Sequence, residues 1–172
     1  VPEGDHVLTT LGGPWGDEFH RERFPLPRGK TVLESRTLAT SHEANPFFLL
    51  HRAGEAGETS GEVLFGQLAY SGNWRLVFDR QDPPGVRVYG VYNPFDFGLT
   101  LPPGGRHATP AFVLGRTREG RDGASRALHA FQRSRVLPRA PGAPAHRPVL
   151  YNSWEVTLFN VDTKGQLELA RR

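Results

Sequence analysis

The sequence predicts a mainly β fold: a portion of an antiparallel β-sandwich (a supersandwich), one linker helix, and then the first βα unit of a truncated (β/α)8 barrel. Three observations predict it. Short strand patterns recur at near-regular spacing between Gly/Pro turns up to residue 117, which favours a β-sandwich over an α/β fold. A helical pattern and a Pro/Ala-rich linker follow. The last segment then has the pattern of a strand with a helix after it.

The strand patterns are of two kinds. Most alternate polar and apolar residues, whereas residues 46–51 form a continuous apolar run that is typical of a strand buried on both faces. The turn at 71–72 predicts a β-hairpin, and in its second strand Trp74 shares one face with Leu76 and Phe78. The predicted strands are 5–11, 18–26, 31–40, 46–51, 62–70, 73–79, 86–92 and 106–117.

Residues 123–136 have the pattern of an amphipathic helix, which Pro138 would end. Its apolar face consists of Ala124, Ala127, Leu128 and Phe131, with Arg126 and Arg133 on the opposite face. Residues 139–147, R-A-P-G-A-P-A-H-R, predict a stiff, extended linker. We therefore expect three parts: the C-terminal portion of an N-terminal sandwich domain at 1–122, the helix and linker at 123–147, and the start of a barrel at 148–172.

Residues 148–162, P-V-L-Y-N-S-W-E-V-T-L-F-N-V-D, predict a short apolar strand that ends in a polar and aromatic cluster at 152–155. A capping box of Thr163 and Gln166 then predicts a helix. A strand with such a cluster and a helix after it is the unit of (β/α)8 barrels, whose chemistry lies at the carboxyl ends of the strands. A whole barrel takes about 250 residues, so we expect the body of the catalytic domain to lie beyond Arg172.

Composition excludes several classes of protein. The fractions of hydrophobic (37%) and charged (23%) residues are those of a globular domain, and no window is apolar for long enough to span a bilayer. The sequence has no Cys, which excludes a disulfide scaffold and a thiolate metal site and fits a cytoplasmic location, and its seven His show no metal-ligand spacing. The net charge of +3 comes from Arg residues dispersed among acidic ones, which argues against nucleic-acid binding. Because the sequence contains no Met, we expect both ends to be cut from a longer chain.

Five longer runs occur in one order: S-H-E-A-N-P-F-F at 41–48, G-E-V-L-F-G-Q-L-A-Y-S-G-N-W at 61–74, N-P-F-D-F at 93–97, G-A-S-R-A-L-H at 123–129 and R-P-V-L-Y-N-S-W-E at 147–155. In content and order they resemble the bacterial α-galactosidases of glycoside hydrolase family 36. The resemblance extends from Gly12 to Arg172. In that family an N-terminal β-sandwich is followed by a helical linker and a (β/α)8 barrel, which agrees with the fold expected from the residues.

The resemblance implies a retaining α-galactosidase that hydrolyses terminal α-galactosides of the melibiose and raffinose type through a covalent glycosyl-enzyme, without a cofactor. It also implies that early sandwich strands precede Val1 and that both catalytic Asp residues lie beyond Arg172, so the fragment itself is expected to be inactive. The expected partner is a galactoside oligosaccharide, with no nucleic acid and no membrane, and the whole enzyme could be a homo-oligomer. Two alternatives stay open: a stand-alone carbohydrate-binding β-sandwich, and a transglycosylase of the same superfamily.

Trp154 is the candidate substrate-binding residue. The resemblance aligns it with a tryptophan that lines the galactose pocket, and an indole face can pack on the C–H face of a pyranose while its N–H serves a hydroxyl. The alternative is a Trp buried between barrel and sandwich. Glu155, next to it, is expected to form a salt bridge or support the site rather than to be half of a catalytic carboxylate pair.

Two other features have structural interpretations. The tripeptide Asn-Pro-Phe begins at Asn45 and again at Asn93, and each copy predicts a turn that leads into a buried strand rather than a docking peptide. Trp74, in the run Gly-Asn-Trp, is expected in the sandwich core rather than on a lectin-like sugar platform.

Overall fold

The computed structural model describes residues 5–40, 43–81, 85–137 and 149–171. Contacts divide the chain into two units, Val1–Val136 and Leu137–Arg172. This division falls inside the predicted helix-and-linker segment 123–147, and the three-part division at 122 and 147 stays a prediction. The predicted linker, 139–147, lies outside the described residues.

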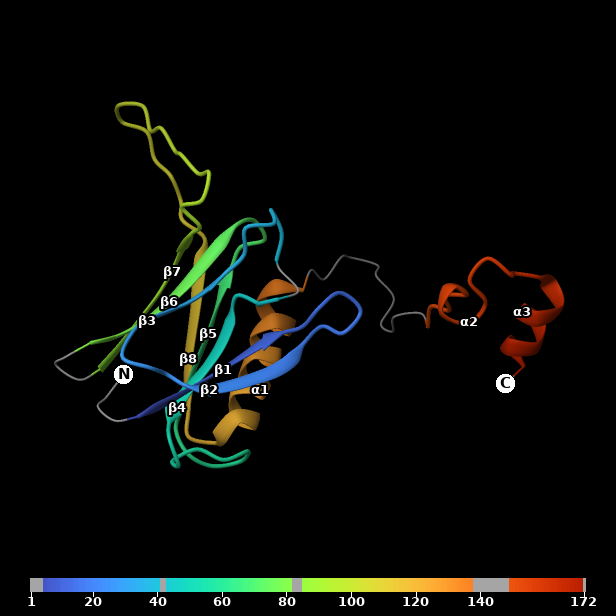
Figure 1. Ribbon diagram of the computed structural model, residues 1–172, viewed down its shortest axis with the longest axis horizontal. Helices are drawn as coiled ribbons and strands as arrows, with labels where there is room; N and C mark the ends of the chain where they lie inside the picture. Colours follow the sequence, from blue (N-terminus) through green and yellow to red (C-terminus); the bar gives the residue numbers. More distant parts are fainter. Residues whose placement is uncertain (1–4, 41–42, 82–84, 138–148, 172) are drawn as a thin grey trace. The chain divides into compact units, whose positions relative to one another are not determined.

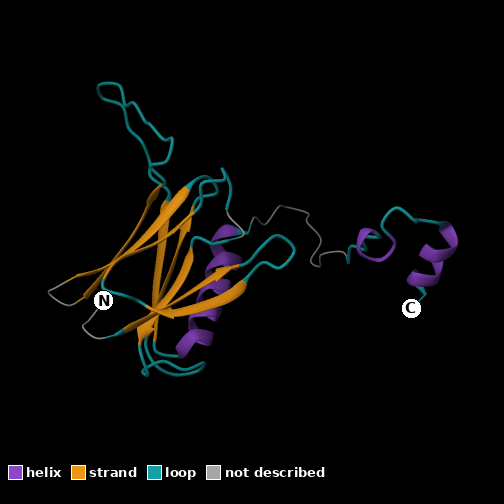
Figure 2. Ribbon diagram, in the orientation of Figure 1, coloured by secondary structure: helices purple, strands orange, loops and turns teal. Residues whose placement is uncertain are grey.

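The first unit contains two antiparallel sheets, which confirms the predicted mainly β fold (Figure 1). Its strands are β1 (His6–Gly12), β2 (His20–Pro25), β3 (Gly29–Glu34), β4 (Phe47–Arg52), β5 (Val63–Ala69), β6 (Trp74–Gln81), β7 (Gly85–Tyr92) and β8 (Ala111–Thr117). The larger sheet has the order β2-β1-β4-β5-β8 and the smaller has the order β3-β6-β7. The two sheets form the layers of a sandwich (Figure 2).

An apolar core joins the two sheets. Trp74, Leu76 and Phe78 of β6 are fully buried in it, as their shared face predicts. Phe48 of β4 meets Phe78 edge-on, with the ring centroids 5.1 Å apart. Burial of one such side chain contributes about 1.5–3 kcal/mol, so these alternate residues are the main attachment of one sheet to the other.

Helix α1 (Gly120–Phe131) covers the outer face of the larger sheet and continues as a π-helix, η1 (Gln132–Val136). Ala124 and Leu128 pack in a second core against side chains of β4 and β5. The predicted helix is thus present, but it begins three residues earlier, and the predicted core residue Ala127 is exposed. Gly120 permits the early start because its φ is 66° and a Cβ there would lie 2.4 Å from the Glu58 carbonyl oxygen.

The hairpin predicted at residues 71–72 is wrong. Strand β5 is hydrogen-bonded to β4 and β8 in the larger sheet, whereas β6 is hydrogen-bonded to β3 and β7 in the smaller one. Because both edges of each strand are already paired, β5 and β6 cannot pair with each other, and the turn carries the chain from one layer to the other (Figure 1). A Gly-containing sequence between two strand patterns predicts a turn, but it does not determine in which sheet each strand lies.

Two predicted strands, 31–40 and 106–117, extend well past the observed strands. Strand β3 ends at Glu34. The Ser35 N–H still donates to the Trp74 carbonyl at 3.0 Å, and the Ser35 hydroxyl donates to the Ala39 carbonyl at 2.6 Å, which turns the chain. Strand β8 begins at Ala111, so residues 106–110 belong to the connection that follows β7. This connection, 93–110, extends away from the sheets (Figure 1).

The second unit contains two short helices, α2 (Trp154–Thr157) and α3 (Thr163–Ala170). The strand predicted at 149–153 is not formed. A β-strand needs a hydrogen-bonded neighbour, and no described residue pairs with this segment, so the first βα unit of a barrel stays a prediction. Helix α3 is present as predicted, but its N-cap is Asp162 rather than Thr163, because the Asp162 carboxylate accepts the Gly165 N–H at 2.9 Å. Among the described residues, no helix is long and apolar enough to cross a membrane.

Candidate functional site

Trp154, the sequence-predicted substrate-binding residue, is the first residue of α2, and its side chain is 48% exposed. The Asn152 side-chain oxygen accepts the Trp154 backbone N–H at 3.1 Å, which fixes the chain direction at the start of the helix. The Phe159 ring contacts the indole perpendicularly, with centroids 4.9 Å apart. The ring is therefore held by a local contact and still has accessible surface. Glu155 is exposed, and no described ion pair involves it.

The second unit exposes much apolar surface for its size. None of its described residues is buried. Its exposed large apolar side chains are Leu137, Val149, Leu150, Tyr151, Trp154, Val156, Leu158, Phe159, Val161 and Leu167. Exposed apolar surface of this extent is typical of a segment that packs against another surface.

Trp74 is the core residue that the sequence analysis predicts, and it is not available to a ligand. It is fully buried between the sheets. This burial excludes the lectin-like platform that its Gly-Asn-Trp context suggested as an alternative.

The two Asn-Pro-Phe turns differ. Asn45 leads directly into the buried strand β4, as predicted, and its amide donates to the Leu11 carbonyl at 3.2 Å. Asn93, at the end of β7, instead leads into the exposed connection 93–110, so the prediction for the second copy is wrong. The two copies share a turn, but the apolar residues after Asn93 are exposed, with Phe95 at 53%.

Asn93 and Glu34 form a polar cluster at the end of the smaller sheet. The Glu34 carboxylate accepts hydrogen bonds from Arg75 at 2.7 Å and from the Asn93 amide at 3.1 Å, and it pairs with Arg36 at 2.7 Å. Burial alone would raise the pKa of Glu34, but the hydrogen bond and charge of Arg75, with the charge of Arg36 and the amide of Asn93, lower it below its ordinary value. The Arg36 guanidinium also lies over the Phe95 ring, 5.1 Å from its centroid. Because every member of the cluster has a partner within the protein, its role is to hold the base of the 93–110 connection.

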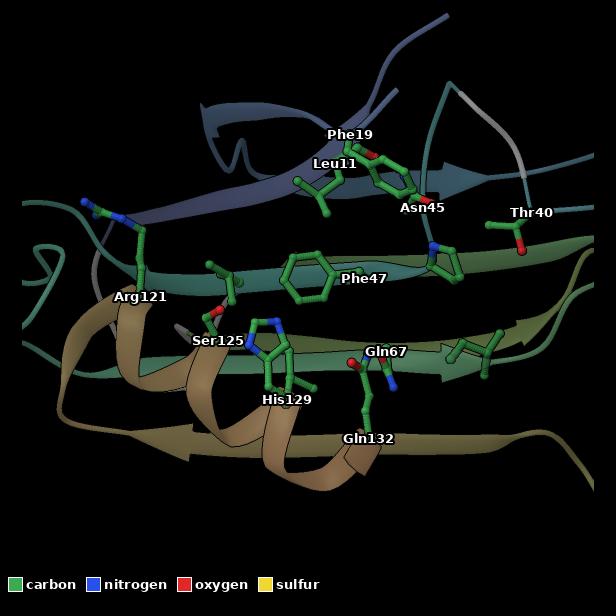
Figure 3. A pocket seen from close by; sticks show the side chains of 14 residues that line it. Leu11, Phe19, Thr40, Asn45, Phe47, Gln67, Arg121, Ser125, His129 and Gln132 are labelled. Carbon is green, nitrogen blue, oxygen red and sulfur yellow. The ribbon is translucent and has the colours of Figure 1, made fainter. Parts of the chain in front are cut away.

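A pocket lies where the larger sheet meets α1 (Figure 3). Phe47 of β4 is at its centre, Leu11 and Phe19 approach from the β1–β2 hairpin, and α1 and η1 supply a polar wall. That wall is formed by Ser125, His129 and Gln132, with Gln67 of β5 beside them. Sequence patterns do not single out these four residues because they come from three separate elements, β5, α1 and η1. The one signal present was the i, i+4, i+7 spacing of Ser125, His129 and Gln132, which places them on the same side of a helix.

No group of three or more His, Cys, Asp or Glu that could hold a metal occurs among residues 5–40, 43–81, 85–137 and 149–171.

Comparison with known proteins connects this geometry to a family. The sequence profile of the Glycosyl hydrolase family 36 N-terminal domain matches residues 1–102. Alpha-galactosidase AgaA of Geobacillus stearothermophilus is 37% identical over 170 residues, which are 99% of this chain and 23% of that protein. Probable alpha-galactosidase G of Aspergillus terreus is 30% identical over 171 residues, again 99% of this chain and 23% of the relative. The chain therefore spans 23% of the length of these curated relatives.

Solved structures agree. The crystal structure of AgaA from Geobacillus stearothermophilus matches with a TM-score of 0.84 and 36% identity. The match covers 99% of this chain and 23% of the AgaA chain. The alpha-galactosidase from Lactobacillus brevis matches with a TM-score of 0.83 and 29% identity over the same shares. The family profile matches more than half of the chain, and the antiparallel sandwich is shared with these enzymes; the chain belongs to glycosyl hydrolase family 36.

Proposed function

We propose that the chain is the sandwich portion and barrel start of a retaining α-galactosidase, which hydrolyses terminal α-galactosides of the melibiose and raffinose type. The observation that carries this proposal is the extent of the similarity to AgaA, which covers 99% of the chain and so includes both units. Variants of AgaA from Geobacillus stearothermophilus have been crystallised in complex with stachyose and with raffinose. These complexes support the substrate class.

The proposed division of labour follows from the residues. A retaining glycosidase needs two carboxyl groups about 5–5.5 Å apart on either side of the scissile bond. The second unit contributes Trp154, and the family resemblance draws both catalytic carboxylates from later barrel strands. In this proposal the chain alone is therefore inactive. No cofactor is needed, since the two carboxyl groups carry both steps.

Trp154 forms a wall of the galactose pocket in the proposed enzyme. Trp154 is the first residue of α2, and about half of its surface is exposed. The apolar face of its ring is therefore available to a sugar ring or to protein. An indole adds a large rigid surface for the C–H face of a pyranose. The neighbouring apolar side chains, with Val149 fully exposed and Leu150 at 90%, are the ones that the barrel would cover.

The experiment compares variants of the full-length enzyme on p-nitrophenyl α-galactoside and raffinose. A pocket role predicts that Trp154→Ala lowers kcat/KM roughly 10- to 1,000-fold, on the order of 1.4–4 kcal/mol of transition-state stabilisation, with little change in Tm. Trp154→Phe recovers part of the loss, since an aromatic face remains. Trp15→Ala, the same substitution at a side chain that is 84% exposed in the first unit, is the matched control and leaves kcat/KM unchanged. If Trp154→Ala lowers Tm by many degrees while the folded fraction keeps normal kcat/KM, Trp154 is a packing residue.

A further inference from the structure

We propose that the pocket between the larger sheet and α1 binds one pyranose unit of a neutral saccharide, as a site separate from catalysis. All of its lining residues belong to the first unit. The proposal is therefore independent of the hydrolytic activity proposed above and of Trp154, which lies in the second unit.

The size and floor of the pocket suit a single sugar ring. Its volume is about 460 Å³, within the roughly 300–1,000 Å³ range of small-molecule sites. Phe47 lies at its centre (Figure 3) and is half-buried. Leu49 and Leu128 also line the pocket and add apolar surface. An accessible aromatic ring on an apolar floor can pack against the C–H face of a pyranose.

The wall supplies the complementary polar groups. Gln67, Ser125, His129 and Gln132 line the pocket, and none of the described hydrogen bonds involves their side chains. The amides and the hydroxyl each both donate and accept hydrogen bonds, and the imidazole adds at least one donor. This is the mixed capacity that vicinal sugar hydroxyls need. The chemistry of the wall thus matches a polyhydroxylated ligand better than a purely apolar one.

A second aromatic ring stands at the mouth. Phe19 lines the pocket, its side chain is 69% exposed, and its φ of 65° lies in the left-handed region. For a bulky residue this conformation costs about 1–3 kcal/mol and is found mostly where a ligand or a clamp requires it. The turn before it is tight, since a Cβ at Gly13 would lie 2.1 Å from the Asp17 carbonyl oxygen. The loop therefore holds an exposed ring beside Phe47 at an energetic cost.

We expect a neutral ligand because, among the described residues that line the pocket, the permanently charged side chain is Arg121 and its charge is already paired. Its guanidinium is already bound by the Glu58 carboxylate at 2.9 Å and by the Ala56 carbonyl at 3.3 Å. A phosphorylated or carboxylated sugar would need a free cation, so the site favours unmodified hexoses.

The test is NMR titration of the 172-residue chain with methyl α-galactoside, methyl α-glucoside and raffinose. Binding predicts saturation transfer to the sugar and shifts of the side-chain amide signals of Gln67 and Gln132, while the exposed Gln81 amide of β6 does not shift. Gln132→Ala weakens binding by about fivefold, the value of one net hydrogen bond. Phe47→Leu weakens it comparably while keeping an apolar side chain at the floor.

Ser125→Ala in α1 and Ser134→Ala in η1, which continues α1, form a matched pair. Ser134 does not line the pocket and donates to the Phe131 carbonyl at 3.2 Å. Ser125→Ala weakens binding and Ser134→Ala leaves it within twofold, with circular dichroism confirming that each variant is folded. The proposal is overturned if no sugar binds to the folded chain up to the solubility limit. It is equally overturned if a sugar binds but Gln132→Ala and Ser125→Ala bind as well as the parent sequence.

Discussion

Asn93 is the residue on which the end of the smaller sheet depends most. It is fully buried, and its amide donates to the Glu34 carboxylate at 3.1 Å and to the Ser35 carbonyl at 3.2 Å. Its side-chain oxygen accepts the Phe95 N–H at 3.0 Å, which starts the 93–110 connection. We predict that Asn93→Ala destabilises the chain although it removes little apolar surface.

The magnitude follows from the partners that are left. The Trp74 carbonyl, which also contacts the amide, still accepts the Ser35 N–H at 3.0 Å, and the exposed Phe95 N–H can turn to water. The Ser35 carbonyl loses its partner in a buried place, and the Glu34 carboxylate loses one donor. Together these losses amount to about 2–4 kcal/mol, or a fall in Tm on the order of 10 °C.

Asn93→Asp tests the same reasoning through pH. The new carboxylate would face the Glu34 carboxylate and the Ser35 carbonyl, so its pKa in the folded state would be raised above the unfolded value of about 3.9. Ionisation of the new carboxyl group therefore destabilises the folded state. This loss of stability is absent below the unfolded pKa and grows as the pH rises through it. Urea unfolding, followed by near-UV circular dichroism, should show a larger loss at pH 7 than at pH 4 for Asn93→Asp. Asn93→Ala should show a weaker trend of the same sign, because it removes one of the donors that lower the pKa of Glu34. A change below about 0.5 kcal/mol for Asn93→Ala, within the range of ordinary surface substitutions, would refute the reasoning.

Two further predictions concern packing and charge. Gly115→Ala in β8 should lower stability by about 1–3 kcal/mol, because a Cβ there would lie 2.2 Å from the Phe65 ring. Gly98→Ala should be near neutral, because a Cβ there would have nothing within 4 Å. Equal urea midpoints for the two variants would contradict this prediction. The lowered pKa of Glu34 stabilises the fold above its ordinary value of 4.5 and this stabilisation is lost as the pH falls through the folded pKa. Glu34→Gln should therefore flatten the acid side of the stability curve, and an unchanged acid slope would show that the Arg75 contact has no such effect.

Part of the first unit is predictable from sequence because alternate residues of its strands are buried in the core between the two sheets. The alternation of Trp74, Leu76 and Phe78 indicates both the strand and its buried side. The pairing of strands is not predictable in this way. Residues 71–72 have the composition of a hairpin turn, yet β5 and β6 lie in different sheets, because a short turn is compatible with either arrangement and the neighbours of each strand decide.

In part of the second unit, the local sequence pattern does not predict the observed structure. Residues 149–153 have a strand pattern, but a strand forms when its backbone groups find partners, and the described residues provide none. The candidate saccharide pocket was missed for a related reason: Phe47, Gln67 and Gln132 come together through strand order and helix docking, which local periodicity does not report. Trp154 could be singled out because the family resemblance, rather than any local pattern, marks it.

The most direct test of the proposed function is the stereochemistry of the reaction. The full-length protein that contains this chain should be incubated with p-nitrophenyl α-galactoside and followed by proton NMR from the first seconds of hydrolysis. A retaining α-galactosidase releases α-galactose first, and the β-anomer appears later through mutarotation. Initial release of α-galactose is the predicted result. Initial release of β-galactose, or no hydrolysis of any α-galactoside by the folded protein, would contradict the proposed function.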